Sequence, residues 1–373
     1  MIIKRFEIGG LWGQEGVISS SLDQKLNIIT GRNGSGKTTV LKLLWYIVSG
    51  NIAQARREID YDYAIVETDK YTIKTTKKNN SETVIELTRD GVTRVMEDEQ
   101  DEDGDLAFDA ERAAKNILED IDRSLFFPTF RRIEGGFATE SSPSRNALSN
   151  PFLNRPAKAK SNLEEALSGV AESLSNEEHT FVSSISTLDI VALLFKRYTD
   201  MSEIANNYQR TISQEVIDDI RTFENQAEKG QTAEAVLEAV KAKIESIDAD
   251  REKTFAPFDA IQKTVTSVLK HSGITLTGRI SFGDAANAIN STSLSAGEKQ
   301  LLSFICYNAF YRDAIIFIDE PELSLHVDWQ RTLFEILEAQ GTTNQFIVAT
   351  HSPFIYSRYS EYEIVLNPDR GED

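Results

Sequence analysis

Apolar residues along this chain of 373 residues form short strand-like runs near its start and helical repeats in its middle. The first two runs cover residues 2–8 and 26–30. Further runs then alternate apolar and polar residues, and the pair Asp90-Gly91 between the last two is typical of a two-residue hairpin. The pattern predicts an antiparallel meander with strands at residues 64–67, 71–76, 83–87 and 92–96.

Helical spacing of apolar residues predicts one early helix and a helical middle segment. The early helix follows residue 38, and Gly50 stands where its C-terminal cap belongs. Residues 160–272 are predicted to form further helices, two of them separated by Gly230. The apolar positions of the early helix are Val40, Leu41, Leu44, Trp45 and Val48. Those of the middle segment are Leu188, Val191, Leu194, Phe195 and Tyr198 on one helix, and Val236, Leu237, Val240, Ile244 and Ile247 on another.

The helical segment is too short for a long tether. Two antiparallel arms of at most about 40 residues would reach only about 60 Å, because a helix rises about 1.5 Å per residue. Apolar residues keep no sustained a/d heptad pattern there. We therefore expect a compact arm suited to contacts between subunits.

The strongest chemical motif lies at residues 31–38, which match the phosphate-binding loop G-x-x-x-x-G-K-[ST]. The loop follows the strand-like run 26–30 and opens the early helix, so its N–H groups and the positive end of that helix can receive phosphate oxygens. Lys37 would reach the outer phosphates, and the hydroxyl of Thr38 would ligate Mg²⁺. A chance match in a glycine-rich turn is the alternative. The strand before the loop and the helix after it favour a nucleoside triphosphate site.

A second motif lies more than 250 residues later, where the apolar run 315–318 ends in Asp319 and Glu320. Such a run is typical of a buried parallel strand, and ligands of open α/β sheets sit at the carboxyl ends of these strands. Asp319 would then hold Mg²⁺, and Glu320 would polarise the attacking water as general base. A surface pair of acids after a core strand is the alternative. Together with the phosphate loop, the pair is typical of a triphosphatase.

Two further features belong to the same series. Ser295-Ala296-Gly297-Glu298 fits the capping-box pattern S-x-x-E at the start of an apolar helix. The same helix start, with a hydroxyl and an exposed glycine amide, would also suit a γ-phosphate, and the two interpretations do not exclude each other. His351 follows another apolar strand at residues 345–350. A lone histidine is usually unremarkable, so its position in the series gives it meaning.

The motifs occur in the order phosphate loop, L-S-x-G-E, strand with Asp-Glu, Ser324-Leu325-His326, and His351 after a strand. This series resembles the ATP-binding-cassette (ABC) ATPase class, and more its chromosome-maintenance and defence branch than its transporter branch. Three segments are similar to ATPases of the overcoming-lysogenization-defect (OLD) group, which includes the ATPase subunits of the Septu, PARIS and retron antiphage systems. These segments are residues 127–134, 320–326 and 349–353.

The resemblance implies an α/β fold, namely an ABC-ATPase head. In such a head a mixed sheet carries the phosphate-loop core and an antiparallel meander lies beside it. A helical insertion would split this head in sequence. The resemblance divides the chain into an N-terminal lobe at 1–135, a flexible basic loop with the helical insertion at 136–274, and a C-terminal lobe at 275–373. No glutamine is assigned to the Q-loop of the class, although Arg131 or Arg132 lies near that position.

The resemblance also implies a slow ATPase that uses ATP and Mg²⁺ and works as a homodimer or higher homo-oligomer. In the class, the signature helix of one protomer covers the triphosphate bound to the partner, so a single chain carries two half-sites. Glu320 and His351 would be catalytic, and Thr38 and Asp319 would hold the metal. The nucleotide would be bound by Asn33, Gly34, Ser35, Gly36, Lys37, Thr38, Thr39, Ser295 and Gly297.

Charge excludes a protein that coats itself with nucleic acid, since the formal net charge is −19. Seven of the nine residues at 97–105 are Asp or Glu, which indicates a solvated acidic loop or a surface for a partner. Residues 141–162 instead carry only basic charges. That stretch is a solvated linker or a local contact to nucleic acid or an acidic partner.

Location follows from two observations. The sequence has no apolar run long enough to cross a membrane, and its start lacks a signal-peptide pattern. The single cysteine, Cys306, cannot form an internal disulfide and is best explained as a small buried apolar residue. These observations predict a cytoplasmic protein without membrane contact.

Two functions from different classes remain open. One is an ATP-gated sensor or scaffold that controls a separate nuclease or toxin effector during phage infection. Only 22 residues follow His351, which leaves no room for the nuclease domain of full-length OLD proteins, so the effector is expected to be a separate protein. The other is a RecF-like DNA repair ATPase that binds DNA. The Ala349-Thr350-His351 motif and the acidic charge favour the first, and a transporter subunit is a distant third.

Overall fold

The computed structural model of the chain consists of two compact units. Unit 1 comprises Met1–Ser186, Ser295–Leu301 and Tyr311–Asp373, and unit 2 comprises Thr187–Leu294 and Leu302–Phe310. The structure describes residues 1–78, 82–100, 106–119, 121, 123–129, 132–133, 162–176, 178–225, 233–269 and 294–366.

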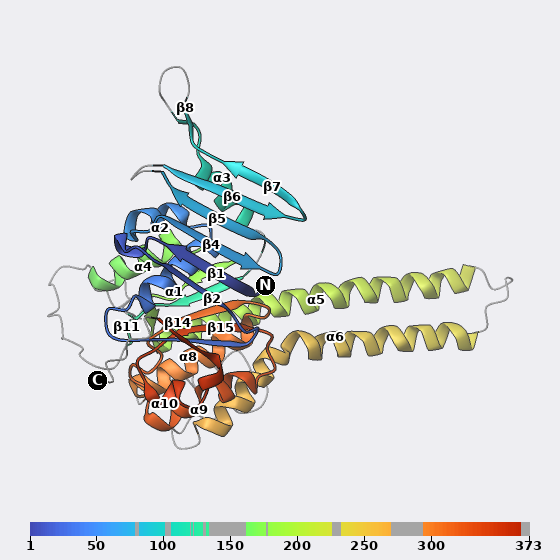
Figure 1. The fold of residues 1–373 in the computed structure, drawn as a ribbon. Coiled ribbons are helices and arrows are strands. Elements are labelled where there is room, and N and C mark those ends of the chain that lie inside the picture. Colours follow the sequence, from blue (N-terminus) through green and yellow to red (C-terminus); the bar gives the residue numbers. More distant parts are fainter. Residues whose placement is uncertain are drawn as a thin grey trace, which may run out of the picture. The chain divides into compact units, whose positions relative to one another are not determined.

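A parallel six-stranded sheet forms one layer of unit 1, with strand order β12-β10-β14-β15-β3-β16 (Figure 1). Every neighbouring pair in it is parallel. The strands β3, β14 and β15 are buried along their whole length, which explains their unbroken apolar sequence. The bounds are β3 Leu26–Thr30, β10 Ser124–Phe127, β12 His179–Phe181, β14 Ile315–Asp319, β15 Gln345–Ala349 and β16 Glu363–Val365.

A second, antiparallel sheet of six strands has the order β2-β1-β4-β5-β6-β7. It contains the four predicted meander strands, and Asp90 (φ 53°) with Gly91 (φ 77°) forms the predicted hairpin turn between β6 and β7. In β4 half-buried and buried residues alternate, as a strand with only one covered face requires. The bounds are β1 Ile3–Gly9, β2 Val17–Ser21, β4 Tyr63–Thr68, β5 Thr72–Lys77, β6 Thr83–Arg89 and β7 Val92–Met96.

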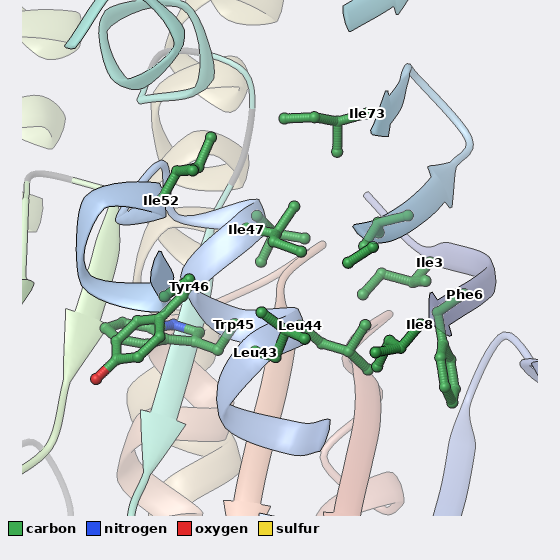
Figure 2. Packing of buried hydrophobic residues seen from close by; sticks show 14 of the residues in the cluster. Ile3, Phe6, Ile8, Leu43, Leu44, Trp45, Tyr46, Ile47, Ile52 and Ile73 are labelled. Atoms are coloured by element: carbon green, nitrogen blue, oxygen red, sulfur yellow. The ribbon is translucent and has the colours of Figure 1, made fainter. Parts of the chain in front are cut away.

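The helix α1 (Lys37–Val48) lies in the core between these two sheets, and its residues from Val40 to Val48 are buried except for the half-buried Lys42. In Figure 2, Leu44 and Ile47 point toward Ile3 and Ile8 of β1, whereas Trp45 lies on the other side of the helix. There the Trp45 ring packs against Phe126 of β10, with ring centroids 5.2 Å apart. The predicted glycine cap is also present, since Gly50 follows the helix with φ 73°. The buried α1 therefore fixes the end of the phosphate loop at the core of unit 1.

The remaining elements of unit 1 are short connections around the sheets. Two small two-stranded sheets pair β8 with β9 and β11 with β13. Helix α8 (Ala296–Phe310) begins in unit 1 and continues into unit 2. The other bounds are η1 Leu11–Gly13, α2 Ile52–Glu58, β8 Glu99–Gln100, β9 Leu106–Phe108, α3 Ala110–Leu118, β11 Arg132–Ile133, α4 Asn162–Leu174, β13 Ser184–Ile185, α9 Val327–Glu338, α10 Pro353–Tyr356 and η2 Ser360–Tyr362.

Unit 2 consists mainly of two long helices, α5 (Thr187–Asn225) and α6 (Ala233–Val268), which Figure 1 shows side by side. Partly buried positions recur every three or four residues along both, as in a coiled coil. Several of these positions are polar: Lys243 Nζ lies 2.7 Å from Asp219 Oδ2, and Tyr208 donates a hydrogen bond of 3.4 Å to Ser246. The sequence showed no sustained heptads because charged residues interrupt the apolar pattern of this seam.

The apolar faces predicted for these helices are only partly buried. Leu194 is 4% exposed, but Phe195 is 51%, Leu237 70% and Ile244 53% exposed. An aromatic cluster closes one end of unit 2, where Tyr198 packs on Phe258 and Phe258 packs on Phe310 at 5.0 Å between ring centroids. Gly230, predicted to separate two helices, lies outside the described residues.

The expected fold class is confirmed, since a parallel sheet that carries the phosphate loop is joined by an antiparallel meander, and a helical insertion interrupts unit 1 in sequence. The division at residues 135 and 275 stays a prediction. Among the described residues, no helix combines the length and apolar character needed to cross a membrane.

Candidate active site

The predicted phosphate loop connects β3 to α1 at the carboxyl edge of the parallel sheet. Gly31 (φ 147°) and Gly36 (φ 92°) both adopt backbone conformations that favour glycine. A Cβ atom at Gly31 would lie 2.5 Å from the carbonyl oxygen of Leu366, and one at Gly36 would lie 2.4 Å from the ring of Trp12. Glycine is therefore required at both positions, and the loop backbone stays open toward the edge of the sheet.

Lys37 is folded over the loop that precedes it. Its Nζ donates hydrogen bonds of 3.1 Å to the carbonyl oxygens of Gly31 and Arg32. Burial lowers the pKa of Lys37, and the neighbouring carboxylates, first Glu320 and then Asp319, act in the opposite direction. These contacts place an ammonium group inside a ring of backbone atoms, which is the arrangement a phosphate-binding lysine needs.

Asp319, at the end of β14, receives hydrogen bonds from two hydroxyl groups. Thr38 Oγ1 donates to Asp319 Oδ1 over 3.0 Å. Thr129, which follows β10, donates to Asp319 Oδ2. The carboxylate itself is fully buried. Three hard oxygen donors, from the start of α1, the end of β14 and the segment after β10, therefore meet at one point.

Glu320 follows β14 with φ 50°, in the left-handed region that residues other than glycine seldom adopt. Burial, followed by a hydrogen bond with Glu322, raises the pKa of Glu320 to about 8. The Nε2 atom of His351 lies 3.3 Å from Glu320 Oε1. Burial also lowers the pKa of His351. Both shifts are toward the neutral forms, which weakens the charge attraction between Glu320 and His351.

The signature segment begins α8 with the predicted capping box. Ser295 N donates to Glu298 Oε2 over 2.8 Å, and Glu298 N donates to Ser295 Oγ over 3.3 Å. Gly297, however, is buried rather than exposed, and a Cβ atom there would lie 2.3 Å from the carbonyl oxygen of Ser324. Gln300 of the same helix donates a hydrogen bond of 2.8 Å to the Pro321 carbonyl. The start of α8 is thus fixed to the loop that follows β14.

The donor set fits Mg²⁺ and a triphosphate. Ser35 Oγ is buried in the phosphate loop and, among the described residues, has no hydrogen-bond partner, so it is available to a phosphate oxygen. The same part of the chain holds no cluster of three or more His, Cys, Asp or Glu side chains suited to a metal ion. Mg²⁺ usually takes one or two carboxylates together with substrate phosphates, and Thr38 with Asp319 supplies the protein's share of such a site.

Comparison with known families identifies this arrangement. Residues 26–357 match the family described as "AAA domain, putative AbiEii toxin, Type IV TA system". The chain belongs to this family. The match includes the phosphate loop, the signature segment, the Asp319-Glu320 strand end and His351. This AAA protein is therefore an ATPase-family protein, in agreement with the resemblance found in its sequence.

A relative with a stated role supports the same class. The AAA protein is 23% identical over 384 residues to the "Retron Vc95 probable ATPase" of Vibrio cholerae serotype O1 biovar El Tor, and the match covers 93% of this chain and 70% of the relative. The expected relationship to retron-type ATPases is confirmed at this level.

Two solved structures have a related arrangement of elements. One is the Smc head domain with an extended coiled coil, bound to the C-terminal domain of ScpA, from Pyrococcus furiosus; its TM-score is 0.38 at 13% identity, over 95% of this chain and 91% of that one. The other is an Smc head bound to the winged-helix domain of ScpA, with a TM-score of 0.39 at 12% identity over 96% and 92%. At these low scores the likenesses concern neither activity nor partners.

The structure brings together five of the predicted site residues and leaves others at a distance from them. The contacts of Ser295 and Gly297 are with Glu298 and Ser324 rather than with the phosphate loop. Asn33 and Gly34 are exposed at the tip of the loop, and Thr39 is half-buried in α1. The five that meet at the carboxyl edge of the sheet are Lys37, Thr38, Asp319, Glu320 and His351.

Two residues of the site were missed by sequence reasoning. Thr129 belongs to the segment 127–134 that carries the OLD resemblance, but no role was assigned to it. Glu322 lies two residues after Glu320 in the segment 320–326, which also carries the OLD resemblance, and it too was given no role. Arg131, considered for the Q-loop, lies outside the described residues, and the side chain of Arg132 is likewise not described.

Proposed function

We propose that this AAA protein binds and hydrolyses ATP with Mg²⁺, closes into a head-to-head dimer on ATP, and controls a separate nuclease or toxin effector in an antiphage defence system. One observation carries the enzymatic part: five side chains meet at one edge of the parallel sheet, namely Lys37 and Thr38 at the start of α1, Asp319 and Glu320 at the end of β14, and His351 after β15. Ligand sites of open α/β sheets lie at this edge.

The roles follow from what each side chain can do. Lys37 and the loop N–H groups would hold the phosphates, and Thr38 with Asp319 would hold Mg²⁺, which supplies charge stabilisation when bound. Glu320 would accept a proton from the attacking water, for which a raised pKa is suitable, because a general base works best near the ambient pH. His351, whose Nε2 atom lies 3.3 Å from Glu320 Oε1, would contact the γ-phosphate.

Dimerisation is supported by the separation of the two half-sites. Ser295 is exposed at the start of α8, where its backbone N–H and its hydroxyl are hydrogen-bonded to Glu298 of the same helix. A helix start with an exposed hydroxyl suits an anion from outside the chain. We infer that this anion is the triphosphate held by a second protomer.

Control of an effector is supported by the retron relative and by charge. The acidic segment begins with Glu97, which pairs with Lys78, and Asp98, which accepts a hydrogen bond from Ala110 N, and residues 101–105 lie outside the described part. Such a patch favours a basic partner, such as a nucleic-acid enzyme, with salt-sensitive association. The helical insertion is the second candidate surface for the effector.

The single cysteine agrees with a cytoplasmic location. Cys306 is buried, and burial raises the pKa of its thiol to about 12, so it behaves as an inert apolar residue.

The enzymatic proposal is tested by phosphate release together with light scattering after size exclusion. Wild-type protein should release phosphate only when Mg²⁺ is present. The Glu320→Gln variant should form a dimer with ATP and a monomer with ADP, whereas Lys37→Ala should stay monomeric in both. A dimer that forms equally with and without nucleotide would contradict closure on ATP.

The defence proposal is tested in cells with the neighbouring gene. The two genes are expressed together and singly, the cells are challenged with phage, and the complex is purified at low and high salt. Protection should require both genes and an intact Lys37. If this protein alone protected cells fully, or if it bound gapped DNA tightly and never its neighbour, a RecF-like repair function would replace the proposal.

A further inference from the structure

Glu322 joins the two segments that carry the catalytic candidates. Its Oε1 atom accepts one hydrogen bond of 2.8 Å from Thr350 Oγ1 and another of 2.8 Å from the backbone N–H of His351. Glu322 belongs to the loop after β14, and Thr350 and His351 follow β15. One carboxylate oxygen therefore connects two loops, since Thr350 and His351 lie 28 and 29 residues after Glu322 in the sequence.

This connection lies just beyond the end of the sheet. The last paired residues of β14 and β15 are Asp319 and Ala349, and Glu320 N still donates to the Ala349 carbonyl over 2.8 Å. The segments then leave the sheet, so the pairing of the two strands no longer fixes them. Glu322 supplies the acceptor for the His351 N–H at the point where the ladder ends.

A second set of hydrogen bonds connects the same two loops. Gln330 of α9 donates from Nε2 to the Leu325 carbonyl over 2.9 Å and accepts at Oε1 from Ser352 Oγ over 2.7 Å. Ser352 N in turn donates to Thr350 Oγ1 over 2.9 Å. The two neighbours of His351 are thus each held by a side chain from the β14 side of the site: Thr350 by Glu322 and Ser352 by Gln330.

The ring of His351 depends on this support. It is 37% exposed, and its Nε2 atom lies 3.3 Å from Glu320 Oε1. A ring this exposed has little packing to hold its position, so the backbone must determine where it lies. Glu320 itself is held by the backbone bond to Ala349, next to the residue whose hydroxyl Glu322 binds.

We propose that Glu322 is a positioning residue for ATP hydrolysis, whose carboxylate fixes the backbone at Thr350 and His351 and so keeps the His351 ring against Glu320. The inference rests on the proposed ATPase function and names a residue that the sequence motifs leave without a role. Lys37 is held by the carbonyl oxygens of the phosphate loop and Thr38 by Asp319, so nucleotide binding should not need Glu322.

The first test separates kcat from KM. Glu322→Ala should lower kcat about 10²-fold, since a misplacement of about 1 Å at a reacting centre costs this much. The KM for ATP should stay within about threefold. Glu322→Gln should restore most of kcat, because the amide oxygen can accept the same two hydrogen bonds. Glu338→Ala, an exposed glutamate of α9, is the matched control and should behave as wild type.

The second test needs no turnover and uses the nucleotide-free protein. The chain contains four histidines, so selective labelling gives a small set of ring signals in nuclear magnetic resonance spectra. In wild type, Glu320→Gln should shift the His351 ring signals. In Glu322→Ala those signals should move and no longer respond to Glu320→Gln, and in Glu322→Gln they should respond as in wild type.

The outcomes distinguish the two proposals. If wild type releases no phosphate, the proposed function fails, and the ring signals alone decide the position of His351. If wild type is active and Glu322→Ala changes neither kcat nor the His351 signals, the positioning role is wrong. Should Glu322→Ala not fold, Thr350→Val removes one of the two donors in an isosteric way. Thr350→Val should lower kcat by a smaller factor than is expected for Glu322→Ala. If Thr350→Val left both kcat and the His351 ring signals unchanged, the inference would be overturned.

Discussion

Thr38 Oγ1 donates a 3.0 Å hydrogen bond to Asp319 Oδ1, although the two residues are 281 positions apart in the chain. The contact joins the phosphate loop after β3 to the end of β14, with β15 between the two strands in the sheet. The hydroxyl and the carboxylate are the oxygen donors that Mg²⁺ prefers. This contact therefore joins the two halves of the candidate site within one chain.

Removing the ammonium group of Lys37 should abolish measurable ATP binding. The Lys37→Ala variant loses a charge-assisted contact to the outer phosphates in a site built for a polyanion. Isothermal titration calorimetry measures the loss. Lys42→Ala is the matched control, because Lys42 lies on the same helix but pairs with Glu58, and it should bind ATP as wild type does. If Lys37→Ala bound ATP nearly as tightly as wild type, the assignment of Lys37 to the outer phosphates would be wrong.

The two carboxylates at the end of β14 should fail in different ways. Glu320→Gln should keep ATP and Mg²⁺ binding and lose about 10²–10⁴-fold in turnover, the usual effect of losing a general base. Asp319→Asn should instead raise the Mg²⁺ concentration required for activity. A Mg²⁺ titration of phosphate release compares the variants, and identical curves would show that the two roles are assigned wrongly.

The order and type of most elements near the site could be predicted from the sequence. The strands β3, β14 and β15 are buried on both faces, so their residues are continuously apolar and stand out from the rest. The meander could be predicted for the opposite reason: only one face of its strands is covered, so buried and half-buried residues alternate along them. Local patterns suffice where burial alone determines the residue type.

Contacts between distant strands could not be predicted. Thr129 reaches Asp319 because β10 pairs in parallel with β14, and no local pattern connects residues that are 190 positions apart. The bond from Thr350 to Glu322 likewise depends on β14 lying beside β15. The signature glycine was misjudged as exposed for the same reason, since the Ser324 carbonyl that covers it belongs to another loop.

Thr129 should contribute to the metal site through Asp319. Thr129→Val removes the hydroxyl that donates to Asp319 Oδ2 and keeps the shape of the side chain. We expect the Mg²⁺ concentration for half-maximal phosphate release to rise about 10-fold, as for other losses of a partner of a metal-ligating group. Thr129→Ser retains the hydroxyl and is the control. Equal Mg²⁺ requirements in the valine and serine variants would contradict this role.

His179 should make unit 1 less stable in mild acid. Trp45 Nε1 donates to Ser124 Oγ over 3.1 Å, and the Ser124 hydroxyl lies 2.7 Å from His179 Nδ1. Burial lowers the pKa of His179 to about 4 from 6.5, so the unfolded chain takes up a proton in this range while the folded chain does not. The free energy of unfolding should therefore fall as the pH falls from 6.5 toward 4, by no more than about 3 kcal/mol from this residue.

Urea unfolding followed by tryptophan fluorescence at pH 7 and pH 5 measures this effect, since the buried Trp45 reports on the core of unit 1. His179→Phe should lower the overall stability but lose this part of the pH dependence. His326→Gln changes an exposed histidine and should leave the pH dependence unchanged. If His179→Phe kept the full pH dependence of wild type, the acid sensitivity would have another origin.

The trans arrangement of the nucleotide site can be tested with two defective chains. Ser295→Arg should leave ATP binding to the monomer intact and block closure of the heads, because its bulk and charge enter the site where the partner's triphosphate is expected. The substitution also removes the Ser295 hydroxyl that caps α8, which costs about 1 kcal/mol. Ser295→Ala removes the same cap without the bulk, so it separates loss of the cap from blocked closure.

Mixing Ser295→Arg with Lys37→Ala chains should restore hydrolysis in mixed dimers. In one of the two sites of such a dimer, the Ser295→Arg chain supplies Lys37 and the Lys37→Ala chain supplies Ser295, so that site is complete. With random pairing, half of the dimers at equal concentrations contain one intact site, and phosphate release should peak at that ratio. Activity that stays absent at every ratio would count against a trans site, or would show that both sites must act together. A second mixture distinguishes these outcomes: wild-type chains titrated with Lys37→Ala lose activity in proportion to the mutant fraction if the sites act independently, and more steeply if both are required.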